Sequence, residues 1–349
     1  MTVRRNWMFA AMALATAFST TGCAAVVVGS AFPAGSSSPQ NRYGFEMSEA
    51  DHYLADSAAF VRSLDPCGFL TEDDLTALGT VVQLRPDGEL STCTAELITG
   101  QSTVTDSVTI NLDAYAPDPD DPDIEEVTIG GRQVYVNNLS TSSCNITFPL
   151  REVFDGADSG IMDGFRTKSG RSYARIEVYR PYEDACPAAT PFAQSALGLL
   201  DDPPLRADSK YNLPLATKDP CGVLEHLPAT WTVDRWSPDS DPYGCTFTAS
   251  SASLDENLVM LDVSLEYVSG DTRAKDTDTV RQGDYSVYTR ELASTCTADI
   301  EVGNPVLGMP EIDDSAARDA RTVPTVSVMA DGCESAIALA VAAADELTG

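Results

Sequence analysis

The chain has 349 residues, which is long for one ordinary domain and suits two domains of roughly 100–200 residues each. Its formal net charge is −31, from 53 acidic and 22 basic residues. A surface this acidic repels nucleic acid and anionic lipid headgroups, so we expect no nucleic-acid partner.

The N-terminus predicts an export signal. Arg4 and Arg5 provide a positive start, an apolar run follows from Trp7 to Phe18, and the small-residue stretch "TTGC" ends at Cys23. This order is typical of a bacterial lipoprotein signal peptide, residues 1–22, that is removed before the following cysteine is lipidated. We therefore expect a lipid on Cys23 and a lipid-anchored protein on the extracellular face of the cell membrane.

The cysteine count favours the same interpretation. Nine cysteines are an odd number for an exported protein, and setting Cys23 aside leaves eight that can pair completely. However, Thr20 stands where lipoprotein signals usually carry an aliphatic residue. Cleavage near Ala31, or retention of the segment through Val28 as an uncleaved anchor, therefore stays open.

The remaining cysteines reveal a tandem duplication. The tetrapeptide Asp-Pro-Cys-Gly (DPCG) occurs at residues 65–68 and again at 219–222, and "STCTAEL" in the first copy matches "YGCTFTA" in the second. The interval between the second and third cysteine is the same in both copies. The first four cysteines thus correspond one by one to the last four: Cys67, Cys93, Cys144 and Cys186 to Cys221, Cys245, Cys296 and Cys333.

The elements of the first copy follow in a clear order. After the DPCG turn, Thr71 as N-cap and Gly79 just past the end delimit a short helix. Alternating apolar residues predict a strand in "SVTINLDAY", and Gly130-Gly131 predicts a hairpin. Further strands are expected in "SCNITFPL" and "SYARIEVYR", and a helix in "PFAQSALGLL". The second copy repeats this pattern and ends in the helix "SAIALAVAAADEL".

This order predicts an α+β fold of two tandem homologous domains, each an antiparallel β-sheet flanked by helices and stapled by two disulfides. We expect a flexible tether over 23–46, a first repeat domain over 47–200 and a second over 201–349. The other face of each sheet is either solvated or lines a groove, and the sequence does not decide which.

Four cysteines per copy allow three pairings. The pairing that ties a helix start to a neighbouring strand is favoured in each copy. It joins Cys67 to Cys93, Cys144 to Cys186, Cys221 to Cys245 and Cys296 to Cys333.

The DPCG turn is followed by an apolar residue and a leucine, and by Cys-Thr about twenty-five residues later. This pattern resembles the actinobacterial DPC-motif lipoproteins, a family of unknown function. It is also distantly similar to the extracellular sensor domains of mycobacterial Ser/Thr kinases. The resemblance covers each copy from about Asp65 or Asp219 onward, whereas members of the family generally carry one domain. It implies an exported, membrane-tethered, non-catalytic module and supplies no active-site residues.

No catalytic, metal or cofactor site is predicted. The DPCG cysteines lack a shared basic neighbour, because His226 near Cys221 corresponds to Glu72 in the first copy. No C-x-x-C pair occurs, and the acidic stretch 116–126 lacks the spacing of a calcium loop. Ser159, in an Asp-Ser-Gly sequence, is best interpreted as a loop residue.

Trp231 and Trp236 are the candidate ligand-groove residues. Indoles beside prolines and loops often line sites for carbohydrate or apolar ligands, although core packing of one or both is the alternative. We therefore expect a non-catalytic cell-envelope lipoprotein that acts as a ligand-binding or sensing module for a glycan, lipid or protein. The alternatives are a secreted hydrolase with residues scattered in sequence, and a protein–protein adaptor.

Overall fold

The computed structural model describes residues 42–44, 47, 49–87, 89–99, 105–118, 120–150, 173–211, 213–227, 230–237, 241–251, 254–268, 277–304 and 321–349. These described residues belong to one compact unit of the chain. They form two seven-stranded antiparallel sheets, each with helices, and four disulfides, so the predicted α+β fold is confirmed.

The first sheet has the strand order β1-β2-β3-β7-β6-β5-β4. Every neighbouring pair is antiparallel, and β7 inserts between β3 and β6. Its strands are β1 (Thr80–Asp87), β2 (Glu89–Ile98), β3 (Asp106–Ala114), β4 (Ile124–Ile129), β5 (Arg132–Ser140), β6 (Ser143–Pro149) and β7 (Tyr173–Tyr179).

The second sheet has the order β11-β12-β13-β14-β10-β9-β8. Read from the other edge and renumbered, this is the order of the first sheet, as a duplication requires. Its strands are β8 (Trp231–Ser237), β9 (Gly244–Ser251), β10 (Leu254–Val268), β11 (Asp278–Gln282), β12 (Tyr285–Leu292), β13 (Thr295–Glu301) and β14 (Arg321–Asp331).

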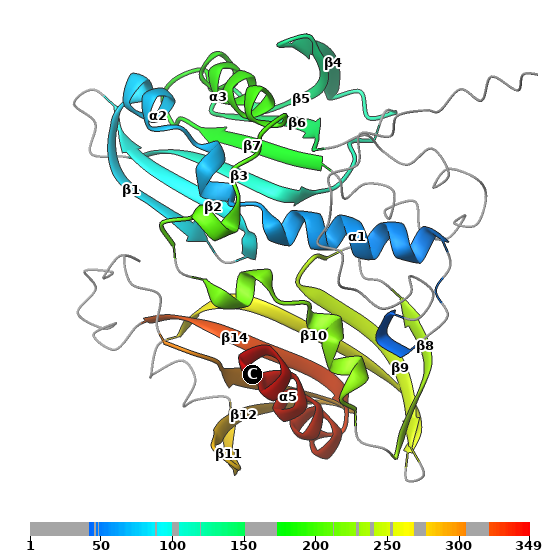
Figure 1. The fold of residues 1–349 in the computed structure, drawn as a ribbon. Helices are drawn as coiled ribbons and strands as arrows, with labels where there is room; N and C mark the ends of the chain where they lie inside the picture. Colours follow the sequence, from blue (N-terminus) through cyan, green and yellow to red (C-terminus); the bar gives the residue numbers. More distant parts are fainter. Residues whose placement is uncertain are drawn as a thin grey trace, which may run out of the picture. The chain divides into compact units, whose positions relative to one another are not determined.

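A long helix covers one face of each sheet (Figure 1). Helix α3 (Cys186–Leu199) packs on β6 and β7, and α5 (Cys333–Thr348) packs on β12, β13 and β14. Alternation along β3 and β7 turns apolar residues such as Ile110 and Ile176 toward α3 and polar residues away from it. Each sheet therefore has a core face under its helix and an open face opposite.

The other helices precede, include or follow the DPCG turns. They are η1 (Arg42–Gly44), α1 (Glu49–Ser63), η2 (Pro66–Phe69), α2 (Glu72–Leu78), η5 (Arg206–Asp208), η6 (Pro214–Thr217) and η7 (Pro220–Glu225). The predicted boundaries of α2 are confirmed, because the Thr71 hydroxyl accepts from the Asp74 N–H and Gly79 is the C-cap. The predicted hairpin at Gly130-Gly131 joins β4 to β5, with both glycines at positive φ.

All four favoured disulfide pairings are confirmed. In each half the first disulfide joins a 3-10 helix to a strand, and the second joins a strand to the start of the long helix. In the first half, Cys67 of η2 bonds Cys93 of β2, while Cys144 of β6 bonds Cys186 of α3.

Two strands were not predicted, and both lie at a sheet edge. β1 and β8 each contain an irregularity at the same place, between Val81 and Gln83 and between Val233 and Arg235. An extra residue in a strand breaks the alternation of apolar and polar residues by which strands are recognised. Pro86 further weakens the strand signal in β1, where an edge position tolerates proline.

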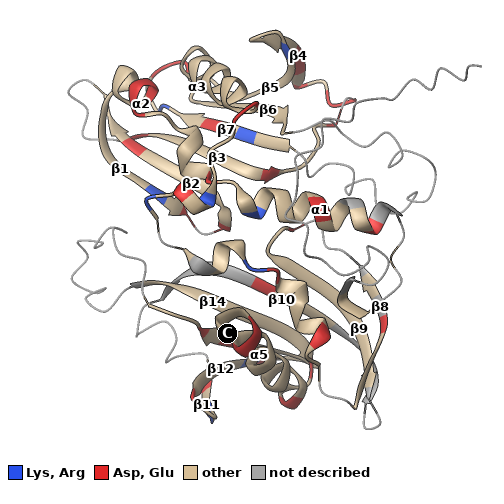
Figure 2. Ribbon diagram, in the orientation of Figure 1, with Lys and Arg blue, Asp and Glu red and all other residues tan. Residues whose placement is uncertain are grey.

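Acidic positions are spread over both halves, and basic positions are fewer (Figure 2). Two of the arginines are nevertheless buried, with Arg62 5% and Arg206 6% exposed. A buried guanidinium is stable only when hydrogen bonds replace the water that it has lost. The hydrogen bonds of these two arginines are therefore needed to keep their guanidinium groups buried.

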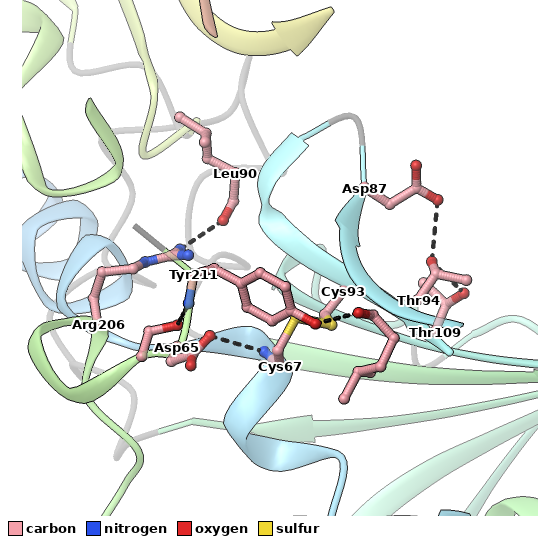
Figure 3. Close-up of a disulfide and its surroundings, with 11 residues drawn as sticks. Asp65, Cys67, Asp87, Leu90, Cys93, Thr94, Thr109, Arg206 and Tyr211 are labelled. Atoms are coloured by element: carbon pink, nitrogen blue, oxygen red, sulfur yellow. Dashed lines mark hydrogen bonds between the residues drawn. A yellow bond between two sulfur atoms is a disulfide. The ribbon is translucent and has the colours of Figure 1, made fainter. Parts of the chain in front are cut away.

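Each DPCG turn is built in the same way. The carboxylate of Asp65 accepts from the Cys67 N–H at 3.1 Å (Figure 3). The carboxylate of Asp219 accepts from the Cys221 N–H at the same distance. Each aspartate thus caps the 3-10 helix that follows. At Gly68 a Cβ atom would lie 2.4 Å from Cβ of Pro204, so close packing demands glycine there.

The residues before each DPCG turn pack on the other copy. Arg62 donates at 2.6 Å to the carbonyl of Pro242, three residues before Cys245. Arg206 donates at 2.6 Å to the carbonyl of Leu90, three residues before Cys93. The two accepting carbonyls are at equivalent positions in the duplication, and the two bonds run in opposite directions between the copies.

A pair of tyrosines repeats this exchange. The Tyr43 hydroxyl donates to the Asp219 carboxylate at 2.6 Å, and Tyr43 belongs to the core of the second sheet. The Tyr211 hydroxyl donates to the Leu84 carbonyl of β1 in the first sheet (Figure 3). Each copy is thus held by residues that precede the DPCG turn of the other.

Replacing Arg62 with alanine tests this exchange. The variant removes the 3.2 Å ion pair with Asp219, whose side chain is only 26% exposed, and the bond to Pro242. We expect the free energy of unfolding in urea to fall by about 3 kcal/mol, the scale for breaking a buried ion pair.

The control is Arg132→Ala, which removes an ion pair with Asp201 whose side chains are 43% and 86% exposed. An exposed pair contributes no more than about 1 kcal/mol. Equal losses in the two variants would contradict the structural importance of Arg62.

Candidate functional site

A groove lies in the first half, between α2 and the edge strand β1. Its volume is about 940 Å³. The floor is apolar and includes Leu70, Leu75 and the Cys67 disulfide, and the walls add Val81 and Leu84. Polar residues form the rim: Asp65, Thr71, Glu72, Thr76, Thr80 and Lys210.

The local sequence explains the position of these walls. Leu75 is the one residue of α2 that is buried, at 1% exposure, and the half-buried Leu78 packs against the same core. Glu72 and Thr76, one helical turn apart, therefore stay exposed at the rim. On β1, Val81 and Leu84 pack against the core from the opposite wall.

Three charged groups line the groove. Asp65 is 6% exposed and lines the groove together with Glu72 and Lys210. Tyr211 contacts the lining, because its hydroxyl donates to the carbonyl of Leu84. Burial, and secondarily the carboxylate of Asp65, raises the pKa of the Tyr211 hydroxyl above its ordinary value, so the hydroxyl stays protonated and can donate to Leu84.

The second half has a different structure at the equivalent place. Trp236 pairs with Phe247 two residues after Cys245, and Leu84 pairs with Ala95 two residues after Cys93, so Trp236 takes the position of Leu84. No helix equivalent to α2 occurs among the described residues that follow η7. The groove between a helix and the edge strand is therefore a feature of the first half in the part of the chain that is described.

The structure places both candidate tryptophans on β8 and against the core of the second sheet. The Trp236 indole N–H lies 3.3 Å from Sγ of Cys221, and the Tyr43 ring packs on the indole with centroids 5.3 Å apart. Trp231 is half-buried on the same strand. Both indoles lie on one strand, but Tyr43 packs on Trp236, and their role in ligand binding stays a prediction.

Other residues considered in the sequence have structural partners. His226 pairs with Glu346 of α5 at 2.8 Å, and the eight cysteines of the two copies are all in disulfides. In the acidic stretch, Asp118 and Asp121 accept from backbone N–H groups two residues on, which fixes the turn before β4. Cys23 and Ser159 lie outside the described residues.

Within the described ranges, no group of three or more His, Cys, Asp or Glu side chains is arranged to hold a metal ion. None of the described helices has the length and the apolar run needed to cross a bilayer. The four disulfides indicate an oxidising, extracytoplasmic compartment.

Sequence patterns missed the groove because one of its walls, β1, was not predicted. The signal that was available is the short helix α2, which carries one buried leucine and therefore cannot cover the sheet edge beside it. Comparisons with protein-family models, curated proteins and solved structures gave no match for this chain.

The contact between Tyr43 and Trp236 yields a spectroscopic prediction. In a Trp231→Phe background, Tyr43→Ala exposes the Trp236 indole, so we expect its fluorescence emission to shift to longer wavelength and acrylamide to quench it more strongly. Tyr211→Ala, which removes the equivalent tyrosine from the first half, serves as the control and should leave the emission unchanged. An unshifted emission in the Tyr43 variant would show that the ring does not cover the indole.

Proposed function

We propose that the protein is a non-catalytic ligand-binding or sensing module of the cell envelope, and that its ligand occupies the groove between α2 and β1. The observation that carries this proposal is an open groove lined by the apolar side chains of Leu70, Leu75, Val81 and Leu84. Its volume of about 940 Å³ lies in the range of roughly 300–1,000 Å³ that small-molecule sites occupy.

The lining defines the class of ligand. Leu70, Leu75, Val81 and Leu84 offer an apolar surface, and each 100 Å² of apolar ligand surface buried there stabilises the complex by about 2.5 kcal/mol. The carboxylates of Asp65 and Glu72 and the ammonium of Lys210 lie at the rim. A ligand with an elongated apolar body and one polar end satisfies both regions.

Binding suits this groove better than catalysis does. The residues that line it include no histidine and no free thiol, and its cysteine is in a disulfide. A thiol nucleophile, or a hydroxyl nucleophile activated by histidine, of the kind that acyl transfer often uses is therefore not formed by these residues. This supports a binding role over the hydrolase alternative.

The lipid anchor is part of the proposal. The leader sequence ending at Cys23 and the oxidising compartment indicated by the disulfides support a lipoprotein tethered on the outer side of the membrane. Tyr43, twenty residues after the proposed lipidated cysteine, is already packed in the second core. The folded part would then lie within a short tether of the membrane surface.

A variant that fills the groove tests the proposed function. Thr76→Trp places an indole in the groove from the exposed face of α2 and leaves the buried Leu75 in place. With Nile red as an apolar probe, we expect saturable binding to the unmodified protein and a loss of affinity of about tenfold or more in the variant, equivalent to about 1.4 kcal/mol.

The matched control is Ala77→Trp, on the same exposed turn but outside the groove lining. It should bind the dye as the unmodified protein does, and both variants should keep the same circular dichroism. Absence of saturable dye binding, or equal weakening by both substitutions, would contradict a ligand site in this groove.

A further inference from the structure

A second, polar pocket lies on the open face of the first sheet, opposite α3. Its volume is about 270 Å³, and its lining residues come from the end of β1, the start of β2, β3 and β7. They are Asp87, Glu89, Thr92, Thr109, Asn111, Arg175 and Glu177. This pocket shares no lining residue with the groove between α2 and β1, so it does not depend on the function proposed for that groove.

The register of the strands brings these side chains together. Asn111 of β3 pairs with Thr92 of β2 on one side and with Arg175 of β7 on the other. Two residues away on each strand, and on the same sheet face, Thr109 pairs with Glu177. Adjacent positions on one sheet face lie close enough for their side chains to act on one small ligand.

Part of the lining is held in place by hydrogen bonds. The Asn111 amide donates to the Glu89 carboxylate at 3.1 Å, and the Thr94 hydroxyl lies 3.1 Å from the Asp87 carboxylate and 3.0 Å from the Thr109 hydroxyl (Figure 3). These bonds fix the rim of the pocket before any ligand arrives, which lowers the entropy cost of binding.

Two charged side chains of the pocket, unlike those just described, have no hydrogen-bond partner in the described part of the protein. Arg175 and Glu177 are half-buried on β7, where Figure 2 marks neighbouring basic and acidic positions. Among the described residues, neither the Arg175 guanidinium nor the Glu177 carboxylate makes a hydrogen bond or an ion pair. Five N–H donors and a carboxylate thus face a preformed hollow without protein partners.

An aromatic pair lies on the same sheet face, beyond the residues that line the pocket. Tyr173 precedes Arg175 by two residues, and Tyr135 pairs with Thr147, which itself pairs with Arg175. The two rings lie 6.4 Å apart and are tilted by 56°. Half-buried tyrosine rings offer an apolar surface beside the polar groups, which is the combination that amphipathic ligands require.

We propose that this pocket binds one neutral sugar ring. A hydroxylated ring accepts hydrogen bonds from Arg175 and Asn111 and donates them to Glu89 and Glu177, while its C–H face packs on a tyrosine. An anionic ligand would meet three carboxylates against one guanidinium, and an apolar ligand would leave the donors unpaired. The volume of about 270 Å³ is below that of sites for drug-sized ligands and suits a single ring.

The second sheet provides an internal comparison. By strand register, Ser327 takes the position of Arg175, Met329 that of Glu177, and Met260 that of Thr109. Met260 is 37% exposed, and Ser327 donates to Asp299 at 2.7 Å. The second face therefore lacks the arginine and two of the polar groups on which the proposal depends.

The test is a titration of the full exported chain with its disulfides intact. Saturation-transfer NMR with glucose, galactose, mannose, arabinose and N-acetylglucosamine should detect saturable binding of at least one of these sugars. Arg175→Ser, which introduces the residue of the second sheet, should weaken that binding about tenfold, the loss expected for a hydrogen bond to a charged group.

Ser327→Ala and the groove variant Thr76→Trp are the controls, and both should keep the sugar affinity. Glu177→Gln offers a second variant should Arg175→Ser fail to fold, and it should also weaken binding. Absence of saturable binding by all five sugars, tighter binding of glucuronate than of glucose, or equal weakening by Ser327→Ala would each overturn the proposal. Because the dye test reports on the other groove, failure here leaves that result unaffected.

Discussion

Two buried arginines connect the two copies of this fold. Tyr43 and Tyr211 add a similar pair of contacts between the copies. Arg62 bonds the Pro242 carbonyl and Arg206 bonds the Leu90 carbonyl, each at 2.6 Å and each at the equivalent place in the other copy. A guanidinium that loses its water must find such partners. Because both accepting carbonyls lie in the other copy, neither copy provides all the hydrogen bonds of its own arginine, and the duplicated fold depends on both halves being present.

The exchange is not fully symmetric. Arg62 also pairs with the Asp219 carboxylate at 3.2 Å, whereas Arg206 reaches the Tyr243 hydroxyl at 3.2 Å and its Nε and Nη1 atoms have no hydrogen-bond partner among the described residues. The two halves also differ at the edge strand and on the open face of the sheet. The first half keeps a helix beside its edge strand and an arginine on its open face, while the second has Trp236 covered by Tyr43 and serine and methionine on that face. Both proposed sites are therefore in the first half.

Repeated local signals made much of the fold predictable. The cysteine pairs, the Thr71 cap and the Gly130-Gly131 turn depend on residues close in sequence or on a matched spacing, and all were confirmed. The edge strands were missed because an extra residue disturbs their alternation, and with β1 the groove was missed. Sites assembled by strand register are harder still: Asn111 and Arg175 are neighbours only because β7 inserts beside β3. No sequence pattern indicates that placement.

The central claim is that the two copies form one interlocked unit. Scanning calorimetry of the oxidised protein tests it most directly, because independent domains unfold separately whereas an interlocked unit unfolds as one. We predict a single transition whose calorimetric and van't Hoff enthalpies agree. Two resolved transitions, or a calorimetric enthalpy about twice the van't Hoff value, would show that each copy folds without the other and would contradict the account.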